Sequence, residues 1–304
     1  MANTLSTKTL RDKYRQAALD KLLRRALIAE AICEVDRTDL KTLQNPYGSQ
    51  PTVTVQALAG TYSVSTFTTT DDTLTVSYEV IIAEHIFDFE RVTSRFDLLA
   101  DRIDEHNFAV AAAIDKYVLN TLVANAGESY TAPAGGFSTA ANLPTIVSNL
   151  LAKVAGFSDM YKGTYLVLEA DDLPGVIAQM AGSGFSFADS ALRNGFIQSY
   201  MGVDLYVTRP ATFFTGTLGE AFTNEGKRLF GVKKTTTFAS PRGIRFEEKQ
   251  VTLKTGVEVV TFGYIGAKVW AAKANLTVAV TNAGASQSIS ASLSPSKSPS
   301  VSPS

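Results

Sequence analysis

The residues best suited to acid–base or nucleophilic chemistry are two histidines and the carboxylates near the second one. His85 lies in an apolar, strand-like run, and His106 follows Asp101 and Glu105 in a long helical pattern. A Ser-His-Asp relay needs a nucleophile in a fixed local context, and the chain has no Gly-x-Ser-x-Gly elbow. Asp101 and Glu105 share a helix face, as a metal site requires, but the intervening Arg102 favours salt bridges. We therefore predict no catalytic residue, no metal site and no enzyme.

Phosphate- and cofactor-binding patterns are explained by local structure instead. The glycines at 182 and 184 lack the third glycine and the preceding strand of a dinucleotide loop, and no Gly-Lys-Ser/Thr loop occurs. The aspartate pairs at 71–72 and 171–172 suit a turn and a helix cap. The sequence predicts no cofactor, although a hydrolase using either histidine remains an alternative.

Composition is that of an ordinary folded protein. The chain has 304 residues, of which 45% are hydrophobic and 19% charged, enough for one large or two modest domains. The single cysteine, Cys33, excludes an intrachain disulfide and suits a small core residue. The first residues lack the apolar core of a signal peptide, and no apolar run reaches the ~18 residues of a membrane span. We expect no membrane association.

The net charge of −1 conceals a separation of charge along the chain. Residues 1–25 carry seven basic and two acidic side chains, a net of +5, whereas residues 71–105 carry ten acidic and three basic, a net of −7. Opposite blocks can pair within or between subunits, or the basic segment can face a polyanion such as DNA. Two solvated helix faces would explain the same pattern. The basic residues are Lys8, Arg11, Lys13, Arg15, Lys21, Arg24 and Arg25.

Residues 52–125 predict a long, threonine-rich β-hairpin that leads into one long helix. Apolar and hydroxyl residues alternate with a period of two in three runs between residues 52 and 80, and Asp71-Asp72 are expected to form a turn. The helix is predicted from about Arg91 to Leu122 and ends near Asn125 and Gly127. Its apolar stripe consists of Val92, Phe96, Leu99, Ile103, Ile114, Val118 and Leu122. So polar a hairpin cannot bury itself against its own helix, which indicates assembly rather than catalysis.

The other predicted elements alternate between helix and strand before the chain returns in strands. A basic helix is expected over 8–34, followed by a break at 45–51 with two prolines. Helices are expected over about 142–156, capped by Asn142, and after Asp171 or Asp172 as far as Gly182. Strands are expected over 164–169, 201–210, 243–253, 257–270 and 276–281. Residues 282–304, with serine at every even position from Ser286, predict a flexible tail.

This order of elements resembles the major capsid proteins of tailed bacteriophages of the Hong Kong phage type. The resemblance covers about residues 8–281 and rests on organisation and local patterns, because no single motif is diagnostic. The run Asp104-Glu-His-Asn-Phe-Ala-Val-Ala-Ala-Ala-Ile-Asp-Lys116 is similar to the family's spine helix. Residues 192–210 resemble its glycine-punctuated strand pair, and residues 257–270 with 276–280 resemble the long strand that returns to the peripheral domain.

The resemblance implies an α+β capsid fold with five parts. These are an N-terminal arm (1–50), an extended loop (51–90), a peripheral domain (91–141 and 239–281), an axial domain (142–238) and the tail (282–304). It also implies homo-pentamers and homo-hexamers in an icosahedral virion shell around double-stranded DNA, assembled in the host cytoplasm. Scaffolding, portal and decoration proteins are implied as further partners, with non-specific contact to the packaged DNA.

In such a shell each extended loop lies across a neighbouring subunit. We expect the inter-subunit contacts to include Tyr62, Phe67, Asp71, Asp72, Arg91, Arg95, Asp101 and Glu105. Some members join subunits through a lysine–asparagine isopeptide bond with its lysine on the loop. No lysine occurs between Lys41 and Lys116 here, so this cross-link is not expected. The alternatives are an encapsulin-like compartment shell, which shares the fold but encloses protein, and a phage tail or fibre component suggested by the Ser-Pro tail.

Overall fold

The computed structural model describes eight parts of the chain, and the elements, contacts and surfaces given below lie within these parts. They are residues 27–48, 69–86, 98–157, 159, 162–182, 196–241, 243–250 and 257–282. The basic residues of the arm, the loop residues 49–68, the predicted helix start at 91–97 and the tail from 283 lie outside them. Within these parts no helix is long and apolar enough to cross a bilayer.

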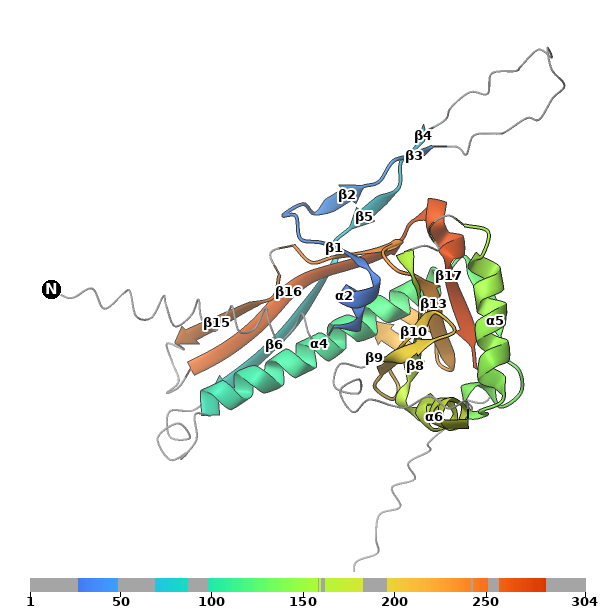
Figure 1. Ribbon diagram of the computed structural model, residues 1–304. Coiled ribbons are helices and arrows are strands. Elements are labelled where there is room, and N and C mark those ends of the chain that lie inside the picture. Colours follow the sequence, from blue (N-terminus) through green and yellow to red (C-terminus); the bar gives the residue numbers. More distant parts are fainter. Residues whose placement is uncertain are drawn as a thin grey trace, which may run out of the picture.

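A five-stranded sheet and one long helix form the elongated half of the molecule (Figure 1). Its longest strand, β16, pairs with four residues of β14, with all of β15 and, in antiparallel register from Ile265↔Tyr78 to Val257↔Ile86, with β6. The strands are β1 (Glu34–Asp36), β6 (Tyr78–Ile86), β14 (Thr236–Ala239), β15 (Arg245–Gln250) and β16 (Val257–Val269). Helix α4 (Leu98–Ala124) packs along β16 and β6 and continues into the second half of the molecule.

A six-stranded mixed sheet forms the second half, in the order β7-β17-β13-β8-β10-β9. The strands are β7 (Glu128–Thr131), β8 (Thr164–Glu169), β9 (Phe196–Tyr200), β10 (Val203–Thr208), β13 (Lys227–Val232) and β17 (Thr277–Thr281). Around it lie α5 (Asn142–Val154), α6 (Leu173–Gly182), the hairpin of β11 (Thr215–Leu218) and β12 (Glu220–Thr223), and the 3-10 turns η1 (Gly136–Ser138), η3 (Ala170–Asp172) and η5 (Ala271–Leu276). Every residue of β8 is buried, as expected for a central strand covered on both faces.

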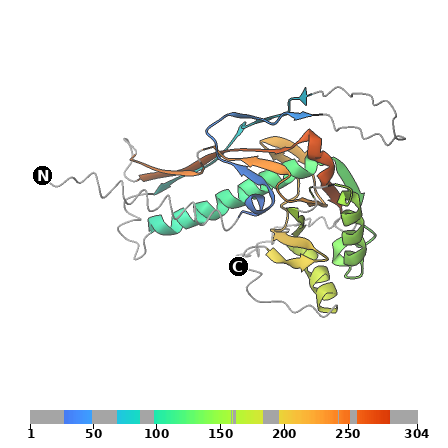
Figure 2. The ribbon, with the colours of Figure 1, turned by 45° about the horizontal axis from the view of Figure 1, so that its top comes forward.

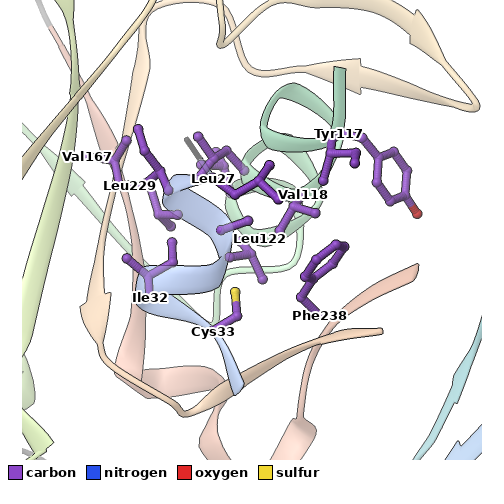
Figure 3. Close-up of a cluster of buried hydrophobic side chains, with 14 of the residues drawn as sticks. Leu27, Ile32, Cys33, Tyr117, Val118, Leu122, Val167, Leu229 and Phe238 are labelled. Carbon is purple, nitrogen blue, oxygen red and sulfur yellow. The ribbon is translucent and has the colours of Figure 1, made fainter. Parts of the chain in front are cut away.

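Two hydrophobic cores cover opposite faces of the six-stranded sheet, with Val167 and Leu229 in the first and Leu166 and Phe230 in the second. One is built around α4, with Ile114, Val118 and Leu122 almost fully buried, as the apolar stripe predicted. The short helix α2 (Ile28–Ile32) packs against α4 in the same core, and Figure 3 shows Ile32 beside Cys33 among these side chains. The second core joins α5 and α6 to the six-stranded sheet. Cys33 is buried, which confirms the prediction of a small core residue, and this burial raises its pKa to about 12.

A narrow stem of paired strands stands on the sheet opposite α4 (Figure 2). Its two ladders pair β2 (Thr42–Gln44) with β5 (Thr73–Thr75), and β3 (Tyr47–Gly48) with β4 (Thr69–Thr70). Gly266 of β16 lies directly beneath it, since a Cβ there would come within 3.2 Å of the Val76 Cα. We call residues 42–48 and 69–76 the loop stem.

The loop stem corrects the predicted hairpin in two places. Its ascending side begins at Thr42, within the segment predicted as arm and proline break, because β2 and β3 supply the ladder partners of β5 and β4. Asp71-Asp72 do not form a hairpin turn; they join β4 to β5 on the descending side, where Asn45 N donates to Asp72 O at 2.8 Å. The prediction placed the turn by local residue type, whereas the long-range ladder decides the register.

Other boundaries also differ from the sequence predictions. The basic helix predicted to residue 34 ends at Ile32, because the chain turns into β1 beside β14. Residues 277–281 do not extend β16 but pair with β13 and β7, so the segment predicted to return to the peripheral domain joins the six-stranded sheet. Asn142 begins α5 without capping it; its side-chain amide donates to Ala134 O and Gly136 O. The end of α4 before Asn125 and Gly127 is confirmed.

Candidate assembly surfaces

The face of the long sheet that points away from α4 carries exposed apolar side chains. Thr261 bonds His106 of α4, so alternation places Phe262 and Tyr264 on the opposite face. Their ring centroids lie 6.5 Å apart in an edge-on arrangement, and Ile81 of β6 pairs with Phe262 in the ladder. Ile81 and Tyr264 remain 57% and 45% exposed. Neighbouring exposed apolar side chains are typical of protein contact sites, so we treat this sheet face as a candidate docking surface.

The loop stem is held to the body by a small apolar cluster and a polar clamp. The cluster contains Leu74, Val76, Ala239 and Trp270, with Leu43 packed against it, and it is separate from the two main cores. The Trp270 indole N–H donates to Thr237 Oγ1 at 2.7 Å, which orients the ring. The clamp joins Asp72 of the stem to Lys268 at the end of β16 through a close ion pair.

The inner end of the arm is held by a buried carboxylate. Asp115 of α4 is 8% exposed and accepts hydrogen bonds from Ile28 N at 3.1 Å and Ala29 N at 2.9 Å. These amides begin α2 and have no partner within that helix. Burial raises the pKa of Asp115 to about 7, against the two amide donors, which lower it. Asp115 therefore holds the described inner end of the arm to α4.

A buried ion cluster organises the six-stranded sheet. Arg228 of β13, 1% exposed, forms a forked contact with Asp172, its Nη2 donating to Oδ1 at 3.2 Å, and its Nη1 lies 2.9 Å from Glu169 Oε2. Asn282 Nδ2 also donates to Asp172 Oδ1, at 2.9 Å. Glu169 accepts from Phe213 N at 3.0 Å through its other oxygen. The oxygens and guanidinium nitrogens of this cluster therefore point at partners, as buried charges require.

The structure refines the capping prediction for Asp171 and Asp172. Asp172 ends η3 directly before α6, and its side chain takes part in a capping box by accepting from Glu169 N at 3.1 Å, so the N-cap residue is Glu169 rather than an aspartate. Its main partner, Arg228, is 56 residues away, a contact that no local pattern could reveal. A local hint was the position of Arg228 directly before the apolar run that begins at Leu229, in a strand whose residues from Arg228 onward are all buried.

Buried amides join α4 to the second half of the molecule. Asn120 Nδ2 donates to Thr212 O at 2.8 Å, and Asn224 Nδ2 donates to Asn120 O at 2.9 Å. Both asparagines are almost fully buried, so each unmade bond would be costly. These contacts, together with the packing of α4 on β13 and β17, connect the long helix rigidly to the six-stranded sheet.

The two histidines occupy structural positions. His106 is 3% exposed; its Nδ1 lies 3.2 Å from Thr261 Oγ1, and its Nε2 lies 3.2 Å from Glu84 Oε2. It therefore links α4 to both long strands. His85 lies on β6 opposite Glu258 of β16. Among the described residues, no group of three or more His, Cys, Asp or Glu side chains could hold a metal ion.

The structure places four of the residues predicted at subunit contacts. Asp71 is exposed at the edge of the loop stem, whereas Asp72 is engaged within the subunit by the clamp. Asp101 lies in α4, in its first turn, and Glu105 is exposed one turn later. Tyr62, Phe67, Arg91, Arg95 and the seven basic residues of the arm lie outside the described residues. Sequence patterns did not predict the exposed sheet face around Phe262, because its exposure depends on which face of the long sheet α4 covers.

The sequence matches no known family, whereas the fold matches solved structures. No protein-family model and no curated protein matches the sequence significantly. The capsid of the cyanophage P-SCSP1u matches with a TM-score of 0.65 at 11% identity, over 84% of this chain and 88% of that chain. A structure from Mycobacterium phage Che8 matches with a TM-score of 0.59 at 18% identity, over 79% and 84%. The capsid of the empty GTA particle matches with a TM-score of 0.59 at 14% identity, over 84% and 89%.

Likeness at these identities establishes the fold. The chain has the capsid fold of these particles, and the predicted α+β fold of the Hong Kong phage type is confirmed.

Proposed function

We propose that this chain is the major capsid protein of a tailed phage, which assembles into pentamers and hexamers of an icosahedral shell around double-stranded DNA. The observation that carries the proposal is the shared fold, which extends over most of this chain and most of the matched capsid chains. The projecting outer end of the loop stem and the exposed apolar side chains of the sheet face support it, because among the described residues they are available for contacts with other subunits. Scaffolding, portal and decoration proteins are proposed as further partners.

The proposed contact places the extended loop of one subunit on the sheet face of its neighbour. This face includes Ile81, Phe262 and Tyr264, and it lies on the same side of the sheet as the loop stem. Assembly energy would then come from many modest contacts of this kind, repeated at every shell position. The basic arm supplies charge for the DNA or for the acidic region 71–105 of a neighbour.

Electron microscopy of the protein expressed alone, with light scattering beside it, tests the proposal. We expect closed shells, or rings of five and six, either alone or after a scaffolding partner is added. Nucleic acid inside shells purified from infected cells would distinguish a virion from a compartment that encloses protein. A stable small dimer under every salt condition, with and without scaffolding protein, would contradict the proposal.

Charging the sheet face should block assembly without unfolding the subunit. In the double variant Ile81→Glu/Tyr264→Glu both substitutions lie at exposed positions, so the melting temperature should change by no more than about 2 °C. Desolvating two carboxylates at every contact should lower the yield of shells at least tenfold, measured by sedimentation. Ala152→Glu, on the exposed side of α5, is the matched control and should leave the yield within twofold. Full assembly of the double variant would exclude this sheet face as a contact.

Mature particles should lack the loop-borne covalent cross-link. The segment between Lys41 and Lys116 has no lysine, so the extended loop cannot supply the amine that attacks an asparagine side chain. Boiled particles should therefore run as a single monomer band on denaturing gels. A regular ladder of covalent oligomers would contradict this prediction.

A further inference from the structure

The position at which the loop stem leaves the body depends on few contacts. Its strand pairs are short, and its apolar cluster of five side chains is separate from both main cores. Beyond Asp72 the stem continues as the β3–β4 pair, which projects away from the body (Figure 1). A small rotation where the stem meets β16 would therefore move its outer end by a larger distance.

A set of polar contacts lies at this junction. Asp72 Oδ1 forms a close ion pair with Lys268 Nζ, and Asp72 Oδ2 accepts from Ala271 N at 2.9 Å. Lys268 Nζ also donates to Thr73 O at 2.6 Å and lies 5.7 Å from the centroid of the Trp270 ring. The clamp thus connects Asp72 and Thr73 of the stem to Lys268 near the end of β16. It also connects Asp72 to Ala271, just after that strand.

The clamp is partly shielded from water. The side chains of Asp72 and Lys268 are 13% and 29% exposed, so their attraction is less screened than that of a surface pair. Partial burial alone would raise the pKa of Asp72, but the Ala271 amide and the charge of Lys268 outweigh it and hold the pKa below its ordinary value. The carboxylate therefore stays ionised at neutral pH.

We propose that the clamp of Asp72, Lys268 and Ala271 N is the device that fixes the direction in which the extended loop leaves the subunit. Asp72 and Lys268 act as positioning residues through their contacts within the subunit. If the chain is a shell subunit, as proposed above, the clamp sets where each loop reaches its neighbour. It thereby restricts the curvatures that the shell can adopt.

Two near-isosteric variants test the clamp in the full-length chain. Lys268→Met keeps the aliphatic stem over Trp270 but removes the charge, and Asp72→Asn keeps the shape but removes the ion pair. We expect amide hydrogen exchange over residues 69–76 of the unassembled subunit to rise at least tenfold in both, with exchange in β8 unchanged. Lys153→Met, which breaks the Lys153–Glu128 pair elsewhere on the surface, is the control. It should leave the rate of amide hydrogen exchange in the stem within twofold of wild type.

The same variants are then assembled, and particle diameters are measured by electron microscopy. Under the proposal they give several size classes or open sheets where wild type gives one diameter. Exchange over 69–76 within twofold of wild type in both variants would overturn the proposal, and so would increased exchange with shells of wild-type diameter. Failure of the wild type to assemble at all would instead contradict the shell function, and the exchange measurement would still decide whether the clamp holds the stem.

Discussion

Replacing Arg228 by methionine is expected to lower the free energy of unfolding by about 3–5 kcal/mol. The substitution leaves Asp172 and Glu169 buried without their cation, and neither carboxylate can reach water without opening the end of the six-stranded sheet. Asn282, which also bonds Asp172, would lose the alignment that lets its Oδ1 accept from Phe137 N at 3.1 Å. Urea unfolding of the unassembled subunit, followed by circular dichroism, measures the change.

Two further variants make this prediction specific. Arg228→Lys keeps the charge but cannot form the forked contact, so its loss should be intermediate. Lys153→Met breaks a 2.9 Å ion pair in which both side chains are about a third exposed, and it should cost less than about 1 kcal/mol. If Arg228→Met does not fold, the stability of Arg228→Lys alone tests the prediction. A loss below about 1 kcal/mol in Arg228→Lys would show that the cluster adds little to stability.

The second large effect is on the pH dependence of stability, and it comes from Asp115. Folding raises the pKa of Asp115 to about 7, whereas an unfolded aspartate titrates near 3.9, so the folded chain binds more protons between these values. Its contribution to stability is therefore complete below about pH 4 and is lost as the pH rises through about 7. Between pH 4 and pH 8 the wild type should lose on the order of 3 kcal/mol more than Asp115→Asn.

The charged neighbours of Asp115 act in opposite directions. Glu30 raises the pKa of this carboxyl and Arg209 lowers it, so burial, the largest cause, decides the sign. Asp159→Asn provides a control of opposite sign, since the hydrogen bond from Lys162 lowers the pKa of Asp159 and its stabilising contribution is lost in acid. Urea midpoints across the pH range measure both variants. Parallel stability curves for wild type and Asp115→Asn would contradict the prediction.

Local patterns predicted the elements whose signal is contained in their own residues. Helix α4 was expected from a stripe that includes Ile114, Val118 and Leu122, and these side chains are buried. The fully buried strand β8 and the end of α4 near Asn125 were predicted in the same way, from an apolar run and from residues that end helices. Predictions of function rested on the order of these elements, which survives when sequence identity to matched capsids is only 11–18%.

Roles that depend on distant partners were not predictable from local patterns. Asp72 has the residue type of a turn but forms an ion pair with Lys268, and Asp172 takes part in a capping box but also forms an ion pair with Arg228, 56 residues away. The predicted pairing of the loop stem was also wrong. The alternating pattern of residues 73–80 indicates a strand, but it does not indicate which other segment pairs with that strand.

The sequence by itself determined the long helix with its buried stripe, the buried strand β8 and the lack of a lysine on the extended loop, because periodicity and composition are local properties, but it did not predict the strands β7, β13 and β14. Only the tertiary structure decided that Arg228 would be buried between two acids, that Asp115 would hold the arm, and that Lys268 would hold the loop stem. The physical reason is that burial and ion pairing depend on which segments meet in space. The same charged side chain stabilises, destabilises or does nothing according to the partner that the fold brings to it.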